Sequence, residues 1–229
     1  MQPQAPSGII NIDKPPGLSS ARVVAQVKRL LPRGTKIGHA GTLDPFATGV
    51  LLLLVGKATK HCERLMSEPK QYVATVKLGA TTETLDPESP EIVTPNASPV
   101  SRETIAQLLP SFVGDIEQMP PIYSALKIGG RPAYEMARSG ETVELKARTV
   151  KIYDIELLRY EWPLLELKID CGRGTYIRSI ARDIGDALNV GGYLTVLRRT
   201  KVGPFPADDA ASVETLMQEG VERHLRAAI

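Results

Sequence analysis

The stretch GHAGTLDPFATGVLLLLVGKATK, residues 38–60, combines turn residues, one acidic residue and an apolar run. Its glycines permit backbone conformations closed to other residues, and Pro45 fixes its own φ while it pushes Asp44 toward an extended conformation. The six apolar residues at 50–55 have the length of a buried strand and fall far short of the roughly 20 that span a bilayer. The pattern therefore predicts a rigid loop that holds the Asp44 carboxylate beside a buried strand.

An Asp-Pro pair alone is an ordinary turn, in which the aspartate accepts local backbone hydrogen bonds. Here the surrounding sequence resembles the active-site loop of the bacterial TruB-type tRNA pseudouridine synthases, which modify uridine 55 in the T-arm. The matching motif is Gly-His-Ala-Gly-Thr-Leu-Asp-Pro-x-Ala-Thr-Gly-Val-Leu. Further motifs match this family in the same order: Gly-Ile-Ile-Asn-Ile-Asp-Lys-Pro-Pro-Gly-Leu-Ser-Ser at 8–20, Lys-Gln-Tyr at 70–72, Pro-Pro-Ile-Tyr-Ser-Ala-Leu-Lys at 120–127 and Gly-Thr-Tyr-Ile-Arg-Ser at 174–179. The resemblance implies an isomerase that converts uridine 55 of tRNA to pseudouridine.

Length and composition limit the classes of protein to which the chain can belong. At 229 residues and 42% hydrophobic, the chain is long enough to bury a substantial core in one large domain or two small ones. Cys62 and Cys171 lie far apart, and the N-terminus lacks a basic region followed by an apolar segment and a cleavage site. We therefore expect a reduced, cytoplasmic protein with no membrane segment. The histidines and cysteines stand singly, without the spacing of a zinc site, so no metal and no cofactor is expected.

The net charge of +2 averages an uneven distribution along the chain. Residues 14–43 include six basic and no acidic side chains, and residues 171–201 include six basic against two acidic ones. By contrast, residues 83–117 hold seven acidic side chains and one basic one. If the two basic stretches share a face, they form a positive surface suited to a phosphate backbone; otherwise they are two solvated helix faces.

The element order predicts an α+β fold. Residues 8–13 read as a strand, and a helix capped by Ser19 or Ser20 runs to about residue 31. After the central strand we expect, in order, a helix over 58–66, a strand over 70–78, a helix capped by Ser101, an extended segment over 119–128, a helix over 132–139, two or three antiparallel strands over 143–171, a helix capped by Thr175 and a last strand over 193–201. The resemblance implies a mixed, largely antiparallel sheet with an RNA-binding cleft across its middle.

The predicted domain organisation is a tail at 1–7, a catalytic domain at 8–205 and a short helical extension at 206–229. Within the catalytic domain, four prolines mark residues 81–100 as a long surface connection rather than an element. The tRNA enzymes of the family usually carry a further C-terminal RNA-binding module, and the residues after Phe205 are too few for an independent one.

The isomerisation breaks an N-glycosidic bond, turns the base and joins C5 to the ribose, without outside energy, redox change or metal. By resemblance, Asp44 is the catalytic carboxylate, acting either as a nucleophile or as a base toward the ribose. Arg178 matches the arginine of the Gly-Thr-Tyr-Ile-Arg motif, and it would pair with Asp44 and favour its ionised form. Tyr72 matches the active-site tyrosine, whose ring can stack on the flipped base and whose hydroxyl can assist removal of the C5 proton.

The resemblance also implies substrate-binding residues. His39 corresponds to the residue that fills the gap left by the flipped base, which leaves its stack at a cost of a few kcal/mol. Tyr176 and Leu197 match residues that line the uracil pocket, and ordinary packing is the alternative for both. Three lysines match basic positions near the cleft, where they either meet phosphates or brace the catalytic loop: Lys14, Lys60 and Lys127.

Rival functions fit the sequence less well. The segment from Gly49 to Lys57 ends in Gly-Lys, but six residues separate its glycines where a phosphate-binding P-loop needs four, and Ala58 stands where Ser or Thr would hold magnesium. A glycosidase would need two acids, whereas the motif supplies one. A non-catalytic RNA-binding module and a guide-RNA-dependent enzyme of the same fold stay open. The expected partner is the T-arm stem-loop of tRNA, bound by a monomer.

Overall fold

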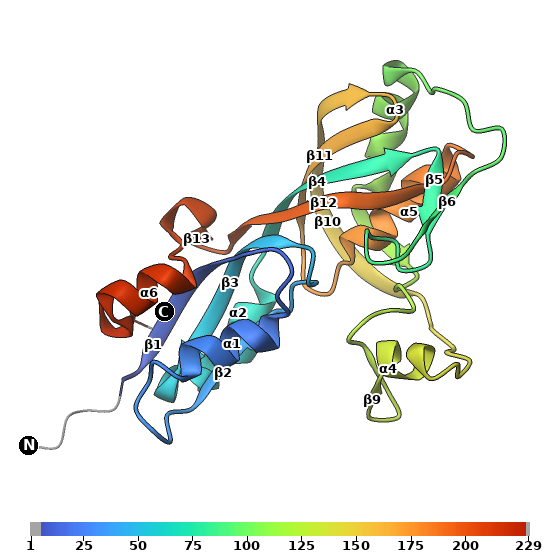
Figure 1. The fold of residues 1–229 in the computed structure, drawn as a ribbon. Helices are drawn as coiled ribbons and strands as arrows, with labels where there is room; N and C mark the ends of the chain where they lie inside the picture. The colour runs from blue at the N-terminus through green and yellow to red at the C-terminus, as the bar shows by residue number, and fades with distance from the viewer. Residues whose placement is uncertain (1–5, 228–229) are drawn as a thin grey trace, which may run out of the picture. The chain divides into compact units, whose positions relative to one another are not determined.

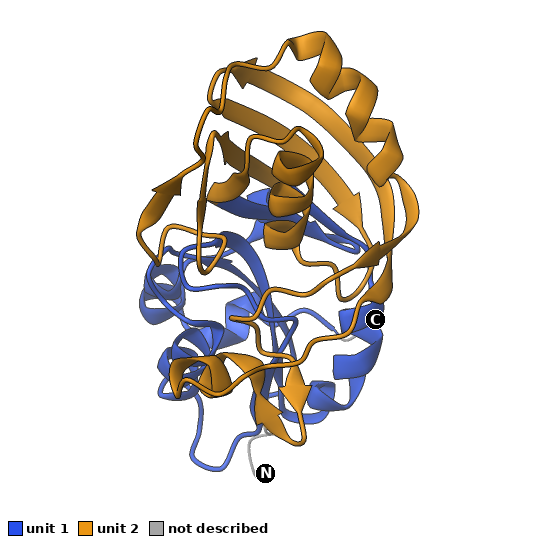
Figure 2. Cartoon of the chain, turned by 90° about the vertical axis from the view of Figure 1, so that its right-hand side faces the viewer, with its two compact units in different colours: residues 1–72, 197–229 blue, residues 73–196 orange. Residues whose placement is uncertain are grey.

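The computed structural model describes residues 6–227; residues 1–5 of the predicted tail and residues 228–229 of the predicted extension lie outside the described residues. The chain divides into two compact units (Figures 1 and 2). Unit 1 comprises residues 1–72 and 197–229, and unit 2 comprises residues 73–196.

Unit 1 is built on the apolar run of the opening motif. This run forms β3 (Thr48–Val55), which pairs antiparallel with β1 (Gly8–Lys14) and with β2 (Ile37–Ala40). On the side opposite β1, β3 also runs parallel to β12 (Gly192–Val202) at Arg198 and Arg199. The predicted buried strand is confirmed, because every residue from Val50 to Val55 is at most 1% exposed.

Helices cover the strands of unit 1. Ser19 caps α1 (Ser20–Lys28), and α1 and α2 (Cys62–Ser67) both contact β2 (Figure 1). The helix expected over 58–66 is divided, because η1 (Gly56–His61) is a 3-10 helix that precedes α2. The helix expected to reach residue 31 ends earlier, since the next backbone N–H groups bond three residues back instead of four.

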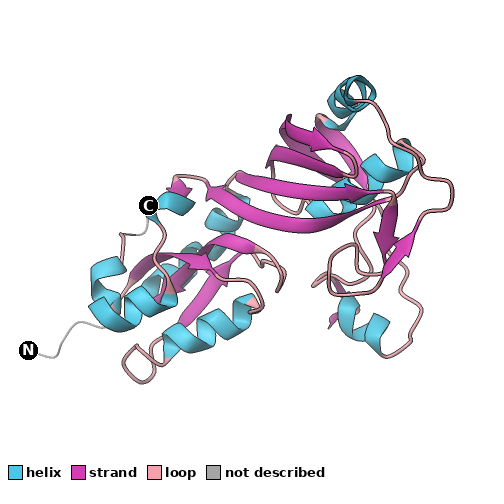
Figure 3. Ribbon diagram, turned by 45° about the horizontal axis from the view of Figure 1, so that its top comes forward, coloured by secondary structure: helices cyan, strands magenta, loops and turns pink. Residues whose placement is uncertain are grey.

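Unit 2 contains the long antiparallel strands. Its sheet order is β12, β4 (Lys70–Leu78), β11 (Leu164–Cys171), β10 (Arg148–Glu161) and β7 (Gly114–Gln118), and β10 pairs antiparallel with both neighbours. Figure 3 draws the strands in magenta. Strands β4 and β12 have residues in both units. Helix α5 (Ile177–Ala187) turns its apolar side inward, with Ile177, Ile180 and Ile184 buried. The α+β class with a mixed, largely antiparallel sheet is confirmed, and the predicted RNA-binding cleft stays a prediction.

The shorter elements complete the chain: β5 (Ala80–Thr82), β6 (Glu91–Val93), α3 (Arg102–Leu108), η2 (Leu109–Phe112), β8 (Lys127–Ile128), β9 (Arg131–Pro132), α4 (Ala133–Arg138), β13 (Phe205–Pro206), η3 (Ala207–Asp209), α6 (Val213–Glu219) and η4 (Val221–His224). Ser212 caps α6, and the backbone of Arg226 bonds to Ile9 at the edge of unit 1. The boundary of the catalytic domain near residue 205 stays a prediction.

Two local predictions were wrong, and one strand was not predicted. The segment 81–100 is not only a connection, because β6 pairs with β5; all three residues of β6 are exposed, so no buried face marks the strand in the sequence. Strand β7 was missed beside the Pro-rich segment that follows it. Thr175 does not cap α5, since Tyr176 occupies the N-cap position and the Thr175 hydroxyl donates to the Gly172 carbonyl instead.

Candidate functional site

Asp44 lies on the loop between β2 and β3 in unit 1, as predicted. The loop begins at Gly41 (φ +93°) and leads to Gly49 (φ +98°), two positions in the left-handed region where other residues are strained. A turn closes inside it, since the Ala47 N–H donates to the Asp44 carbonyl at 3.1 Å. Asp44 itself is half-buried. The backbone therefore presents this carboxylate from a tight, sharply bent loop.

Lys14 forms a hydrogen bond with the backbone of Pro45, the residue after Asp44. Its side chain is 0% exposed, and its amino group donates to the carbonyls of Pro45 (3.0 Å), Leu18 (2.7 Å) and Pro15 (2.8 Å). The Gly17 N–H donates to the same Pro45 carbonyl at 2.8 Å. Of the two roles that the sequence left open for Lys14, bracing the loop fits this position, because a buried ammonium group does not reach a phosphate in solvent.

Ser20 forms hydrogen bonds with the backbone of Leu43, the residue before Asp44. This serine is the first residue of α1 and is buried, and its hydroxyl donates to the Leu43 carbonyl (3.1 Å) while it accepts from the Leu43 N–H (2.9 Å). Both backbone groups of the neighbour of Asp44 are thus satisfied by one side chain. The loop is fixed on either side of the carboxylate by β1 and α1.

Three more predicted residues lie in unit 1. Tyr72 on β4 and Leu197 on β12 are buried, and His39 on β2 is half-buried. Burial, and then the charge of Arg199, lower the pKa of His39 below its ordinary value. The His39 Nδ1 is buried and has no hydrogen-bond partner among residues 6–227, which also favours the neutral ring.

Arg199 was missed by the sequence reasoning. It is 1% exposed and is the largest of the fully buried side chains among the described residues. Strand alternation carries the signal that could have found it, because a period of two from the buried Leu197 places residue 199 on the same face.

In unit 2, the predicted catalytic Arg178 projects from the first turn of α5 and is 4% exposed. Its Nη1 donates to the Asp86 carboxylate (3.2 Å) and to the Thr84 carbonyl (2.9 Å), and its Nη2 donates to the Tyr123 carbonyl (2.9 Å). Asp86 is 2% exposed and was missed, because it lies in the segment expected to be a surface connection. The pairing of Arg178 with Asp44 stays a prediction.

Tyr176 stands just before α5. Gln118, at the end of β7, holds its backbone on both sides: the Tyr176 N–H donates to Oε1 (2.8 Å), and Nε2 donates to the Tyr176 carbonyl (3.1 Å). The guanidinium of Arg148 lies over the tyrosine ring, 4.8 Å from its centroid. A half-exposed ring held in this way can offer a flat surface to a base.

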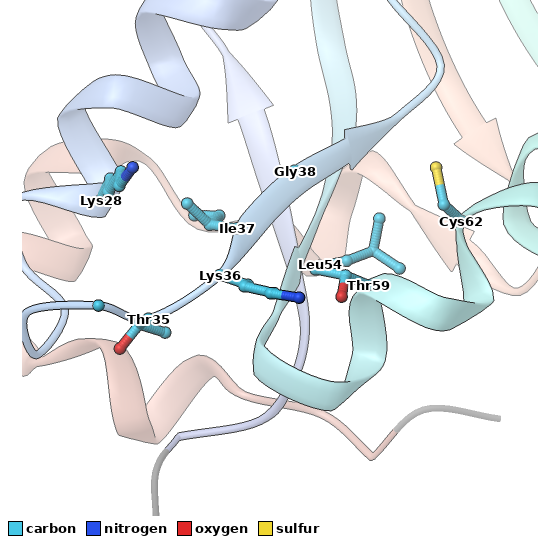
Figure 4. Close-up of a pocket in the computed structure, with 9 residues that line it drawn as sticks. Lys28, Thr35, Lys36, Ile37, Gly38, Leu54, Thr59 and Cys62 are labelled. Atoms are coloured by element: carbon cyan, nitrogen blue, oxygen red, sulfur yellow. The ribbon is translucent and has the colours of Figure 1, made fainter.

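The two remaining predicted lysines, Lys60 on η1 and Lys127 on β8, are exposed. An exposed ammonium group is free to meet phosphates, and this role stays a prediction for both. A separate cavity of about 540 Å³ in unit 1 (Figure 4) is lined by Lys28, residues 34–38, Leu54, Thr59 and Cys62.

Within residues 6–227, no group of three or more His, Cys, Asp and Glu side chains could hold a metal ion. In the same part of the chain, each helix is too short or too polar to cross a bilayer.

The chain is similar to known proteins along most of its length. Residues 28–177 match the N-terminal domain model of the TruB family pseudouridylate synthases, and residues 178–229 match the tRNA pseudouridylate synthase B C-terminal domain. The tRNA pseudouridine synthase B of Phocaeicola vulgatus is 45% identical over 90% of this chain and 90% of its own length. That of Francisella tularensis subsp. novicida is 44% identical over 96% of this chain and 72% of its own length.

A solved structure, the crystal structure of a Cbf5-Nop10-Gar1 complex, contains a similar chain. The TM-score is 0.71 and the sequence identity 35%, over 92% of the chain described here. The similarity spans 54% of that solved chain.

Proposed function

The chain belongs to the TruB family of pseudouridylate synthases, and from this premise we propose that it isomerises uridine 55 in the T-arm of tRNA to pseudouridine. The relatives that are 44–45% identical are named tRNA pseudouridine synthase B, which supports tRNA as the substrate. We further propose that the enzyme acts as a monomer in the cytoplasm, with no metal or other cofactor.

The observation that carries the proposal is the fixed loop around Asp44. Lys14 and Ser20 bind the residues on either side of this carboxylate, so its backbone is positioned before substrate arrives. Preorganisation of this kind favours a group that must attack or deprotonate one atom of a bound sugar. Asp44 would act on the ribose of the flipped uridine, as a nucleophile or as a base.

The other predicted residues take roles around the extruded base. We propose that Arg178 favours the ionised form of Asp44, and that Tyr72 stacks on the uracil and assists removal of the proton from C5. Tyr176 and Leu197 line the uracil pocket in this proposal, and His39 takes the place of the base in the T-loop. Lys60 and Lys127 bind phosphates, while Lys14 braces the loop.

A second candidate follows from the similarity to a chain solved together with Nop10 and Gar1. It is a pseudouridine synthase that works only within a larger assembly, such as a guide-RNA-dependent enzyme. The higher identity to the enzymes named for tRNA favours the first candidate.

One experiment separates the two candidates. The purified chain is mixed with an unmodified tRNA transcript carrying tritium at C5 of its uridines, with no other RNA or protein, and tritium release is measured. We expect release from one uridine per tRNA, with pseudouridine at position 55, also when a chelator is present and the transcript is already folded. A transcript with cytidine at position 55 is the control and should release none.

Absence of release from the bare transcript would refute the first candidate. Release that begins only after a guide RNA or partner proteins are added would establish the second.

A further inference from the structure

Arg199 connects the two ends of the catalytic loop. Its Nη2 donates to the Gly41 carbonyl (3.1 Å) and its Nη1 to the Thr42 carbonyl (3.4 Å), at the start of the loop. Its Nε donates to the Val50 carbonyl (2.7 Å), just past the end of the loop. One guanidinium therefore spans the base of the loop that presents Asp44.

The same guanidinium reaches a second proposed site residue. Its Nη1 lies 3.5 Å from the hydroxyl oxygen of Tyr72, a long hydrogen bond. Three strands thus meet at one side chain: β12 carries Arg199, β3 supplies the Val50 carbonyl, and β4 carries Tyr72.

The burial of this charge needs an explanation. Among residues 6–227, no carboxylate lies within ion-pair distance of the Arg199 guanidinium, and the side chain is 1% exposed. Burial of an ion without an opposite charge is costly, and here backbone carbonyls supply the compensation. A purely structural position would be filled at lower cost by an apolar residue, so the retained charge points to a positioning role.

The guanidinium group of arginine, with N–H donors in several fixed directions, suits this geometry, whereas the single ammonium group of lysine does not. Three different nitrogen atoms of Arg199 reach carbonyls at both ends of the loop. A lysine would supply one ammonium group, which cannot occupy all of these directions at once.

The backbones of β12 and β3 also lie very close together at Arg199 and Gly49. Arg199 is the parallel partner of Gly49, and a Cβ on Gly49 would stand 2.2 Å from the Arg199 carbonyl oxygen. No other residue fits at position 49, so β12 lies directly against the end of the loop. A displacement of the Arg199 side chain is therefore transmitted to the loop without an intermediate layer.

We propose that Arg199 is a positioning residue for the isomerisation, which holds the Asp44 loop closed at its base and aligns it with the Tyr72 hydroxyl. This inference rests on the proposed function of the site. Arg199 acts through the loop and touches neither the uridine nor the ribose.

The test compares Arg199→Lys and Arg199→Ala with Arg198→Lys. Arg198 is the matched control, because it is the preceding residue on the same strand but forms a partly exposed ion pair with Asp13. Single-turnover pseudouridine formation, the Kd for a T-arm stem-loop and the melting temperature are measured for each variant. We expect Arg199→Lys to lose about 100-fold in rate with its Kd within about threefold of the wild type, because a loop shift of about 1 Å suffices for such a loss.

Chemical rescue separates positioning from folding. Methylguanidinium should restore part of the rate of Arg199→Ala in a saturable manner, and it should leave Arg198→Lys and the wild type unchanged. A rate for Arg199→Lys within threefold of wild type would overturn the proposal. So would a rate loss that is fully matched by weaker RNA binding and not restored by methylguanidinium.

A second measurement does not depend on the substrate. Amide hydrogen exchange of residues 42–47 should become faster in Arg199→Lys, while exchange in β10 and β11 stays unchanged. Unaltered exchange in the loop would refute the positioning role even if the substrate proves to be another RNA. A wild-type enzyme that is inactive on tRNA, together with faster loop exchange in the variant, would instead refute only the proposed function.

Discussion

Asp44 is the residue on which the proposed chemistry depends most directly. Asp44→Asn keeps the shape of the side chain and suits a turn about as well as aspartate, but it removes the charge that attacks or deprotonates the sugar. We expect pseudouridine formation to fall below detection while the melting temperature and the Kd for T-arm RNA stay close to wild type, or the RNA binds more tightly. The three measurements are made on the same preparation. Near-normal turnover by a folded Asp44→Asn protein would remove Asp44 from the mechanism.

His39 should be neutral at physiological pH. Burial and the nearby Arg199 charge both lower its pKa, so we expect the ring to titrate below about 6.5 in the folded protein. Because the unfolded chain then binds more protons than the folded one, the His39 contribution to the free energy of unfolding decreases as the pH falls below about 6.5. NMR titration of the ring protons, assigned with His39→Gln, measures the pKa. A value at or above 6.5 would contradict the expectation.

At the scale of elements, the loop is fixed from outside itself. Strand β1 supplies Lys14, helix α1 supplies Ser20, and strand β12 supplies Arg199, so each contributes a side chain to one of the loop's backbone groups. Two apolar residues of the loop, Leu43 and Ala47, are also buried in the core. The conformation of the loop is therefore decided by the elements that surround it.

Ser20→Ala should remove the two hydrogen bonds that connect the loop to α1. Two buried backbone groups of Leu43 lose their partner, which we expect to cost about 1–3 kcal/mol in the free energy of unfolding and to lower the rate of pseudouridine formation at least tenfold. Denaturant unfolding and single-turnover kinetics measure the two effects.

Ser19→Ala is the matched control for this prediction. Ser19 caps the same helix by accepting from the Arg22 N–H, so its loss should cost about 1 kcal/mol without displacing the loop. We expect its rate to stay within about threefold of wild type. Equal rate losses in the two variants would show that helix stability, rather than the Leu43 contacts, controls activity.

At the scale of the whole molecule, charge should govern RNA binding. Five basic residues of the segment 14–43 are exposed, namely Arg22, Lys28, Arg29, Arg33 and Lys36, whereas Lys14 is buried. Each phosphate neutralised by such a side chain releases counterions, so log K for a T-arm stem-loop should fall with log salt at about −0.7 to −0.9 per neutralised phosphate. Filter binding between about 50 and 200 mM salt measures this slope.

A double variant, Arg29→Gln with Arg33→Gln, tests whether these side chains are responsible. We expect a slope that is shallower by about 0.7–0.9 for each phosphate that is no longer neutralised, with the loop chemistry intact once RNA is saturating. Binding that does not depend on salt would contradict an interaction with phosphates altogether.

Local sequence patterns predict the buried strand β3, the bent loop with Asp44, the capped helices α1 and α3 and the α+β class. These features depend on local causes, namely apolar period, turn chemistry and capping side chains, which can be read within a few residues. The family motifs carried the proposed roles of Asp44, Tyr72 and Arg178. The exposed strand β6 and the half-buried strand β2 were not predicted, because neither has an alternation of buried and exposed side chains to reveal it.

The burial of Lys14, Asp86 and Arg199 is visible only in the tertiary structure. In the sequence Asp86 and Arg199 are charged residues like many others, and charged residues are exposed by default. The family motif left two roles open for Lys14. Each has a partner far away along the chain: the Pro45 carbonyl lies 31 residues from Lys14, and the Val50 carbonyl lies 149 residues from Arg199. Strand alternation can indicate that residue 199 faces the core, but no local pattern encodes these acceptors, since the fold must first bring the backbone carbonyls together before a buried charge is stable there.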